Sequence, residues 1–343
     1  MSRLKYLLPP VDRYFKANLH THSTISDGRL TPEELKAAYK AKGYSILSIT
    51  DHDVVANHSY LNDEDFLMLT GAEYDISEMG KPIRRGHGKA YHLNCIAKRP
   101  DILWQPFANK TVRDDVAPYL EIANIESLPR EYDTGAINAI IDRANETGHL
   151  VMYNHPHWSG QAYPDYAGLK GLWGMELSNY GCMVAGYGDR ENATIYRDMV
   201  NLSGKLFPLC TDDSHSMRDV GGGWIMVGAE ELSYGSVIRA LEQGAFYAST
   251  GPEIYSLTFA DNTLRVTCSD AQKVEVICGN RFALRADPIH NDGLIREAKF
   301  NLKLWLESCL DLPQYWFQVR IQGPYGHVAT TRAYRKEDLL GND

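Results

Sequence analysis

A chain of 343 residues is long enough for one large domain and a small one. Hydrophobic residues make up 44% and charged residues 23%, the balance of an ordinary globular protein. The formal net charge is -9 with no basic run, so we expect no long nucleic acid as a partner. The six cysteines form no CxxC pair and no apolar run is long enough to span a membrane, which predicts a cytoplasmic protein without membrane contact.

The first two-thirds of the chain alternates short apolar runs with helical patterns. Strands are predicted at 17–19, 46–49, 66–69, 91–96, 150–152, 175–177 and 206–209. One helix is predicted to follow Thr31, because Pro32 suits a first helical turn and Glu34 completes a capping box. A second is predicted over 136–148. This alternation predicts an α/β fold with a mainly parallel sheet, either open or closed into a barrel.

The pattern changes after residue 255. Alternating strand-length segments such as 263–267 and 317–321 follow one another between turn residues, without a strong helix pattern. We therefore predict an α/β domain over 1–255 and a small all-β, sandwich-like domain over 256–343. We expect the second domain to pack on the first and to lie outside the functional site.

Histidines and carboxylates are concentrated directly after the predicted strands. The set consists of His20, His22, Asp27, Asp51, His52, Asp53, Glu73, His155, Asp212, Asp213 and His215. In a parallel α/β fold such positions meet on one face, and an HxH pair on extended chain directs both imidazoles to the same side. Mixed imidazole and carboxylate ligands suit Zn, Mn or Fe ions. For His58, His149, His290 and His327, a hydrogen-bonded or surface role is expected instead.

The ordered motifs resemble those of the PHP (polymerase and histidinol phosphatase) family of metal-dependent phosphoesterases. They are His20-Thr21-His22 with Ser26-Asp27-Gly28, Ile49 to Asp53, Gly71-Ala72-Glu73, Asn154-His155-Pro156 and Asp213-Ser214-His215. The resemblance runs from about residue 16 to 255. The close of this region, ending at Glu253, is similar to the stand-alone branch of the family.

This resemblance implies a distorted (β/α)7 barrel with two or three divalent ions (Zn, Mn or Fe) at the strand ends. One ion is expected on His20, His22, Glu73 and Asp213, a second on Glu73, His92 and His155, and a third on Asp27, His52 and His215. His92 is favoured over His87 because strand spacing fixes its position better than the glycine-rich loop fixes His87.

For other polar residues near these motifs, the sequence predicts supporting roles or leaves two roles open. Asp51 and Asp53 are expected to orient histidine ligands, and Gly28 to allow a tight turn after Asp27. Asn18 could orient a water or cap the backbone, and Asp212 could be only a strand-end residue. Arg84, Arg85 and Arg218 are candidates for phosphate contact or for solvated surface charge. His157 could serve as a general acid or substrate contact, or could stack on Trp158.

The expected activity is hydrolysis of small phosphomonoesters or phosphodiesters of the nucleotide or sugar phosphate type. Bound ions would attract a phosphate dianion despite the acidic chain, and metal-bound hydroxide would attack phosphorus in line. Hydrolysis of a non-phosphate ester or amide is the alternative, since the same nucleophile attacks carbonyl groups. A non-catalytic scaffold role is less favoured because the ligand set is complete and no polymerase-sized extension is present.

Overall fold

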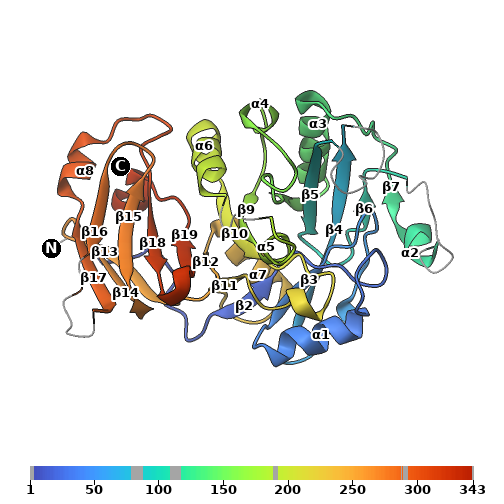
Figure 1. Cartoon of the computed structure of the whole chain (residues 1–343), viewed down its shortest axis with the longest axis horizontal. Helices are drawn as coiled ribbons and strands as arrows, with labels where there is room; N and C mark the ends of the chain where they lie inside the picture. Colours follow the sequence, from blue (N-terminus) through green and yellow to red (C-terminus); the bar gives the residue numbers. More distant parts are fainter. Residues whose placement is uncertain are drawn as a thin grey trace.

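The computed structural model describes residues 4–78, 88–108, 117–187, 192–286, 288 and 293–341. Over these ranges the protein is a mixed α/β structure with a 13-stranded sheet, a 4-stranded sheet and a 2-stranded sheet. Figure 1 shows β2–β12 on one side and β13–β19 on the other, with the N-terminus beside β13–β19. Among the described residues, no helix has both the length and the apolar character needed to cross a membrane.

The elements alternate through the first two-thirds of the chain. The strands there are β1 (Lys5–Tyr6), β2 (Phe15–Asn18), β3 (Ile46–Ile49), β4 (Leu67–Ser77), β5 (Ala90–Ala97), β6 (Trp104–Gln105), β7 (Asn124–Ile125), β8 (His149–Tyr153), β9 (Gly174–Asn179), β10 (Phe207–Thr211), β11 (Trp224–Val227) and β12 (Phe246–Ser249). The helices are α1 (Pro32–Ala41), α2 (Ala117–Ile122), α3 (Thr134–Glu146), α4 (Tyr163–Tyr166), α5 (Tyr180–Val184), α6 (Ala193–Ser203) and α7 (Tyr234–Gln243).

The predicted strands and helices of this region are present, as β2, β3, β4, β5, β8, β9 and β10 with α1 and α3. The capping box of α1 forms as expected: the Thr31 hydroxyl accepts from the Glu34 N–H, and the Glu34 carboxylate accepts from the Thr31 N–H. Leu35 and Tyr39 then bury the inner face of α1.

The prediction of a mainly parallel sheet is wrong, because the large sheet is mixed. Strands β2, β3 and β4 are parallel, as are β8, β9 and β10, but β5 runs antiparallel to β4 and β8, and β11 antiparallel to β2 and β12. The start of β5 therefore lies at the same edge as the end of β4, with His92 opposite Asp75.

Strand β10 lies at one end of the large sheet, yet it also contacts β11 and β12. In the sheet, these strands follow the order β10-β9-β8-β5-β4-β3-β2-β11-β12. One buried cluster takes side chains from both ends of this order and from its middle, including Leu209 on β10, Ile225 on β11 and Ala17 on β2. The sheet thus curves around a shared core, and its strand ends converge on one side.

The prediction of an all-β C-terminal region is also wrong in detail. The region contains β13 (Ile254–Ala260), β14 (Thr263–Ala271), β15 (Lys273–Cys278), β16 (Ala283–Ala286), β17 (Ile295–Asn301), β18 (Phe317–Gln322) and β19 (Val328–Thr331), with helices α8 (Lys303–Ser308) and α9 (Lys336–Leu340). Amphipathic turns at Lys303 and Lys336 place Trp305 and Leu339 in the core, so short helices form between the strands.

This region is joined to the rest of the protein by backbone pairing. Strand β19 pairs with β12, which extends the large sheet, and the N-terminal β1 pairs with β13 in the 4-stranded sheet (Figure 1). One buried cluster draws on both sheets, with Val266 on β14 and Val319 on β18. A boundary near residue 255 stays a prediction, and strand pairing crosses that point in both directions.

The buried histidine at the start of β8 generates a stability prediction. Burial lowers the pKa of His149 to about 4 from 6.5, against the effect of the Ala144 carbonyl 3.2 Å from its Nδ1. The folded protein holds this ring neutral, so its unfolded form takes up a proton first as pH falls. We expect stability to decline between pH 6.5 and 4, with His149 contributing up to about 3 kcal/mol of that decline.

The measurement is the free energy of unfolding at several pH values for the wild type and for His149→Asn. The variant should show a shallower decline across this window, whatever its stability at neutral pH. The exposed His327→Asn serves as the control and should keep the wild-type slope. If the free energy of unfolding declines equally with pH in the wild type and in His149→Asn, protonation of His149 does not contribute to the decline.

Candidate metal centre

The nine predicted ligands converge at one end of the strands. They are His20, His22 and Asp27 after β2, His52 after β3, Glu73 in β4, His92 in β5, His155 after β8, and Asp213 and His215 after β10. Most are buried, and Asp27 is the most exposed, at 56% of its side chain. Four groups of these side chains have donor atoms close enough to hold a cation.

The tightest group contains His20, His22, Glu73 and Asp213. The Nε2 atoms of the two histidines lie 3.2 Å apart. Asp213 Oδ1 lies 3.2 Å from His20 Nε2 and 3.0 Å from His22 Nε2. The two Glu73 oxygens each lie 3.3 Å from one of the same nitrogens. Five donor atoms from the four side chains expected to hold the first ion therefore lie within short distances of the two imidazole nitrogens.

The orientation of these atoms fits a cation better than hydrogen bonding. Glu73 Oε2 and Asp213 Oδ1 are buried and have no hydrogen-bond partner within the described chain, despite ring nitrogens at 3.0–3.3 Å. Four tetrahedral ligands at zinc-like bond lengths lie about 3.3–3.4 Å from one another. Spacing and orientation both match donors that are directed at a common point.

Glu73 also faces a second group. Its Oε1 lies 3.0 Å from His92 Nδ1 and 3.4 Å from His155 Nε2. The Asn154 side-chain amide donates to the same oxygen at 2.6 Å. His52 Nδ1 lies 3.2 Å from Glu73 Oε2, so this histidine sits between Glu73 and the third group. Glu73 is thus placed where a bridging carboxylate is expected.

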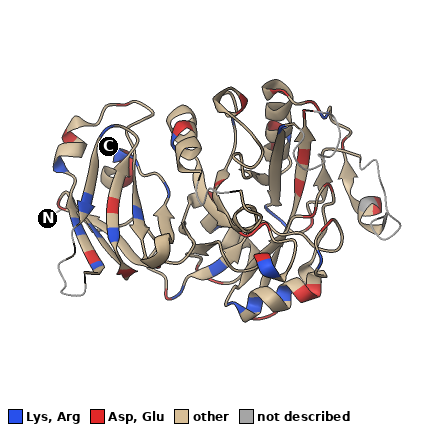
Figure 2. Ribbon diagram, viewed as in Figure 1, with Lys and Arg blue, Asp and Glu red and all other residues tan. Residues whose placement is uncertain are grey.

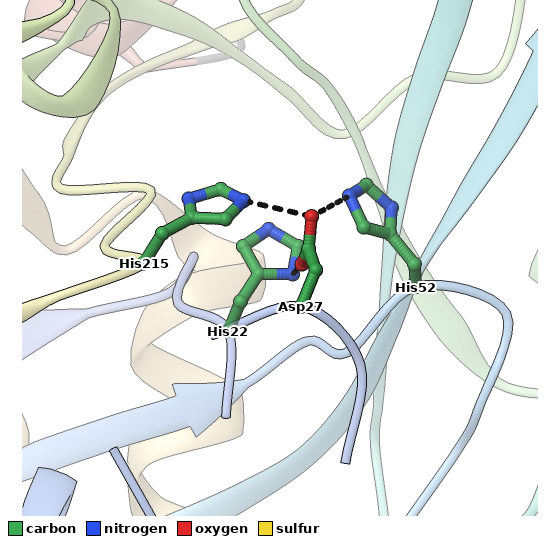
Figure 3. A group of neighbouring side chains, drawn as sticks. All are labelled: His22, Asp27, His52 and His215. Carbon is green, nitrogen blue, oxygen red and sulfur yellow. Dashed lines mark ion pairs between the residues drawn. The ribbon is translucent and has the colours of Figure 1, made fainter. Parts of the chain in front are cut away.

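The third group is looser and more open (Figure 3). Asp27 Oδ2 lies 3.4 Å from His215 Nε2 and 3.9 Å from His52 Nε2. His22 belongs to this group as well, since its Nδ1 lies 3.8 Å from Asp27 Oδ1. Its ring stacks on those of His52 and His215, with centroids 4.4 Å apart in both cases. His22 therefore links the third group to the first.

Charges in the centre stabilise one another. Burial opposes ionisation of Glu73, but His20, His92 and His52 hold the pKa of this carboxyl well below its usual range. Burial also opposes protonation of His22, and Asp213 and Glu73 outweigh it to raise the pKa of His22 to about 10. The carboxylates thus stay ionised at neutral pH and require positive charge beside them, from protons or from cations.

Glu176 is a functional residue that the sequence reasoning missed. It is fully buried in β9 and accepts hydrogen bonds from His20 Nδ1 at 2.6 Å and from the His155 N–H at 2.7 Å. Thr211 and Asn179 donate to it at 2.6 and 2.9 Å. The contact with His20 Nδ1 directs its Nε2 toward the centre. The available signal was a carboxylate between two apolar residues of a predicted strand.

Asp51 holds a loop instead of a histidine, so its predicted role is wrong. Its carboxylate accepts from the N–H and hydroxyl of Ser23 at 2.7 and 2.6 Å, and from the Ser26 hydroxyl at 2.6 Å. Gly28 closes the same loop, and a Cβ there would lie 2.1 Å from the His22 carbonyl oxygen. Gly28 is thus needed for close approach of two chain segments, which fixes the loop that carries Asp27.

Three other expectations are settled by hydrogen bonds. Asp53 pairs with Arg130 at 2.9 Å, so its predicted contact with a histidine is wrong. Asp212 accepts the N–H groups of 221–223 as a strand-end residue. Asn18 caps the backbone, with its Oδ1 accepting from the His20 N–H at 2.9 Å. These groups define the backbone below the centre.

Backbone strain is also concentrated here. Asp53, His155 and Asp213 have φ values of 55°, 24° and 49°, a region that non-glycine residues rarely adopt. Two of the three are predicted ligands and the third follows a predicted ligand. Such conformations persist only where surrounding contacts impose them, and they are concentrated at functional sites.

The predicted phosphate-contacting residues are placed less directly. Arg84, Arg85 and His87 lie outside the described residues. Arg218 is exposed and donates to the Val184 carbonyl at 2.9 Å, and His157 is exposed on the loop after β8. Trp158 packs on His155 and His92. The roles of Arg218 and His157 toward substrate stay predictions.

Comparisons with known proteins give distant relatives. No family model matches the sequence. A 5'-3' exoribonuclease from Haemophilus influenzae is 28% identical over 163 residues, which is 45% of this chain and 57% of the relative. The chain therefore spans little more than half the length of that curated relative.

The chain is also similar to solved structures of other proteins. One is a two-domain protein containing a predicted PHP-like metal-dependent phosphoesterase from Bacteroides vulgatus, at 15% identity and a TM-score of 0.42 over 97% of this chain and 99% of that one. Another is the lesion-specific endonuclease PfuEndoQ from Pyrococcus furiosus, at 15% identity and a TM-score of 0.40 over 67% and 56% of the two chains.

At these TM-scores, the motifs and the geometry of the centre are the basis for assigning a function. The chain resembles the PHP family through an ordered set of motifs whose side chains meet at one buried centre.

The position of Glu176 generates the prediction for this centre. Glu176→Gln keeps the shape of the side chain and removes the charge that holds His20. We expect metal affinity to fall about 10- to 100-fold, since His20 then loses its fixed orientation. Titration of metal-free protein with Zn²⁺ or Mn²⁺ against a competing chelator measures it. Glu242→Gln, which breaks a surface pair with Lys98, is the control, and equal affinity of the two variants would contradict the role of Glu176.

Proposed function

We propose that this protein is a metal-dependent phosphoesterase of the PHP family that hydrolyses small phosphomonoesters or phosphodiesters. The observation that carries the proposal is a pair of buried carboxylate oxygens, on Glu73 and Asp213, that make no hydrogen bond within the described chain although imidazole nitrogens lie at 3.0–3.3 Å. A buried carboxylate oxygen without a hydrogen bond is costly, and a bound cation would offset that cost.

We also propose that β2–β12 form a distorted barrel of the PHP type, followed by a sandwich-like region. Contacts of β10 with β11 and β12 and the shared core support this proposal. In such a fold, side chains at the carboxyl ends of parallel strands form the active site. The antiparallel β5 adds His92 from its N-terminal end to the same rim.

Two or three divalent ions, Zn, Mn or Fe, would be held by the nine ligands. When bound, such ions neutralise phosphoryl oxygens and lower the pKa of water to yield a nucleophile. Three ions would bring six positive charges against four carboxylates once Glu176 is counted, a net of about +2. That charge would attract a phosphate dianion to an otherwise acidic protein.

The residues of the chain perform the positioning. Asn154 and Glu176 hold Glu73 and His20 in place, so the central group is rigid and closed to solvent. Asp27 and His215 are far more exposed, which makes the third group the side from which substrate enters. A phosphate arriving there would lie next to His22 and His52 and displace solvent from the open face.

The phosphoester class is favoured over the alternative ester or amide. The Haemophilus influenzae relative is named a 5'-3' exoribonuclease, a name that describes cleavage of phosphodiesters. In this chain, the proposed ions and the open third group suit a doubly charged phosphate better than a neutral amide.

A substitution pair tests the proposed site and reaction together. Glu73→Gln should lower the content of more than one ion and reduce the rate of phosphoester hydrolysis more than about 100-fold. The reason is that this carboxylate faces His20, His52 and His92, which belong to different ligand groups. Asp27→Asn should lower the content of about one ion and weaken turnover less, because only the third group depends on it. The measurements are metal analysis and product formation from a panel of phosphomonoesters and phosphodiesters with added Mn²⁺ or Zn²⁺.

Asp101→Asn, which removes a surface partner of Arg99, should change neither quantity. Equal metal content in the Glu73 and Asp27 variants would remove the bridging role from Glu73. Hydrolysis of carboxylic esters or amides by the wild type, without cleavage of any phosphomonoester or phosphodiester, would replace the proposed reaction by its alternative.

A further inference from the structure

Two aromatic side chains, Trp158 and Tyr187, border the metal centre and are called the aromatic wall here. The Trp158 ring lies 4.9 Å from that of His155 and 5.5 Å from that of His92, edge to face in both cases. The Tyr187 ring lies 6.1 Å from Trp158, at an angle of 74°. The wall thus begins in direct contact with two predicted ligands and extends outward from them.

Core packing does not account for the aromatic wall. Neither residue belongs to a hydrophobic cluster in the described part of the chain, Trp158 is only half-buried, and Tyr187 is 43% exposed. Trp158 lies on the loop after β8 and Tyr187 follows α5, which itself follows β9. Both are therefore on the rim where the strands end, on the side of the second metal group.

Two other sectors of the rim carry polar groups. Asp27 and His215 form the open side of the third group. Arg130 crosses a further sector, where it donates to the Asp53 carboxylate at 2.9 Å and to the Asp75 carbonyl at 3.1 Å. A ligand held at the centre by its phosphate would thus meet an aromatic surface at the wall and charged groups elsewhere.

We propose that the aromatic wall binds the planar ring of the substrate, so that the preferred esters are aromatic ones, either nucleotides or aryl phosphates. This inference rests on the proposed phosphoesterase function. A planar ring gains by offset or edge contact with Trp and Tyr, and stacking of this kind tolerates different bases. Trp158 is held by the histidine rings beside it, whereas Tyr187 lies farther out and is free to be varied without touching a ligand.

Four probes separate the ring from the phosphate in the full-length, Mn²⁺-loaded protein: AMP and p-nitrophenyl phosphate carry a ring, while ribose 5-phosphate and glycerol phosphate carry none. Tyr187→Ala should raise KM for both ring-bearing probes about five- to tenfold and leave kcat, and KM for the ringless probes, within about twofold. An effect on AMP alone identifies a nucleotide wall, and an effect on both ring-bearing probes identifies a general aryl wall.

The matched control is Tyr255→Ala, which removes an exposed tyrosine from β13 and should leave all four probes unchanged. An equal change for ringed and ringless probes in Tyr187→Ala, or no change in either, overturns the proposal. Calorimetric binding of AMP and ribose 5-phosphate provides a second readout. If the wild type hydrolyses none of the four monoesters, the monoester part of the proposed function fails, and the wall is then judged by binding alone. Tighter binding of AMP that Tyr187→Ala abolishes supports it, and equal or absent binding overturns it.

Discussion

The structure depends on one arrangement: an ionised carboxylate, Glu73, buried among histidine rings with too few hydrogen bonds to satisfy it. Burying a charge is costly unless it is paired, so everything around Glu73 must supply compensation. Asn154 satisfies one oxygen, and the rings of His20, His22, His52, His92 and His155 lie around the remainder. A site of this kind favours cation binding, because bound ions would compensate the buried negative charge of Glu73.

Support for the centre comes from every element that borders it. Asp51 and Gly28 shape the loop that carries Asp27, Glu176 fixes His20 and the backbone of His155, and Asp212 fixes the chain after Asp213. The unusual φ values of His155 and Asp213 show that this support overrides local backbone preference. The ligands are consequently placed by the fold, and bound metal would complete an arrangement that already exists.

Much of this centre could be predicted from sequence because its ligands follow strands. His20, His22 and His52 each occupy the first positions after an apolar run, where strand polarity alone brings them together. The same logic does not account for His92. In a parallel sheet, site residues are expected after the carboxyl end of a strand, and His92 lies near the start of β5. The antiparallel pairing of β4 with β5 brings His92 to the site, and no local sequence pattern reveals that pairing.

Residues that act through tertiary hydrogen bonds were harder to predict. Glu176 looks like part of a strand, and Asp51 and Asp53 flank a ligand without touching a histidine in the way their positions suggested. The strands predicted in the C-terminal region are present, but its edges pair with β1 and β12, which no local pattern encodes. Periodicity reports which face is buried and does not report the partner that covers it.

The most direct test of the account is anomalous diffraction from crystals of the full-length protein grown with Mn²⁺. The account predicts two or three peaks, one of them about 2.0–2.3 Å from donor atoms of His20, His22, Glu73 and Asp213, with Glu73 bound to a second peak as well. A map without a peak at this centre, in which the same histidines and carboxylates are joined by ordinary hydrogen bonds, would contradict the central claim.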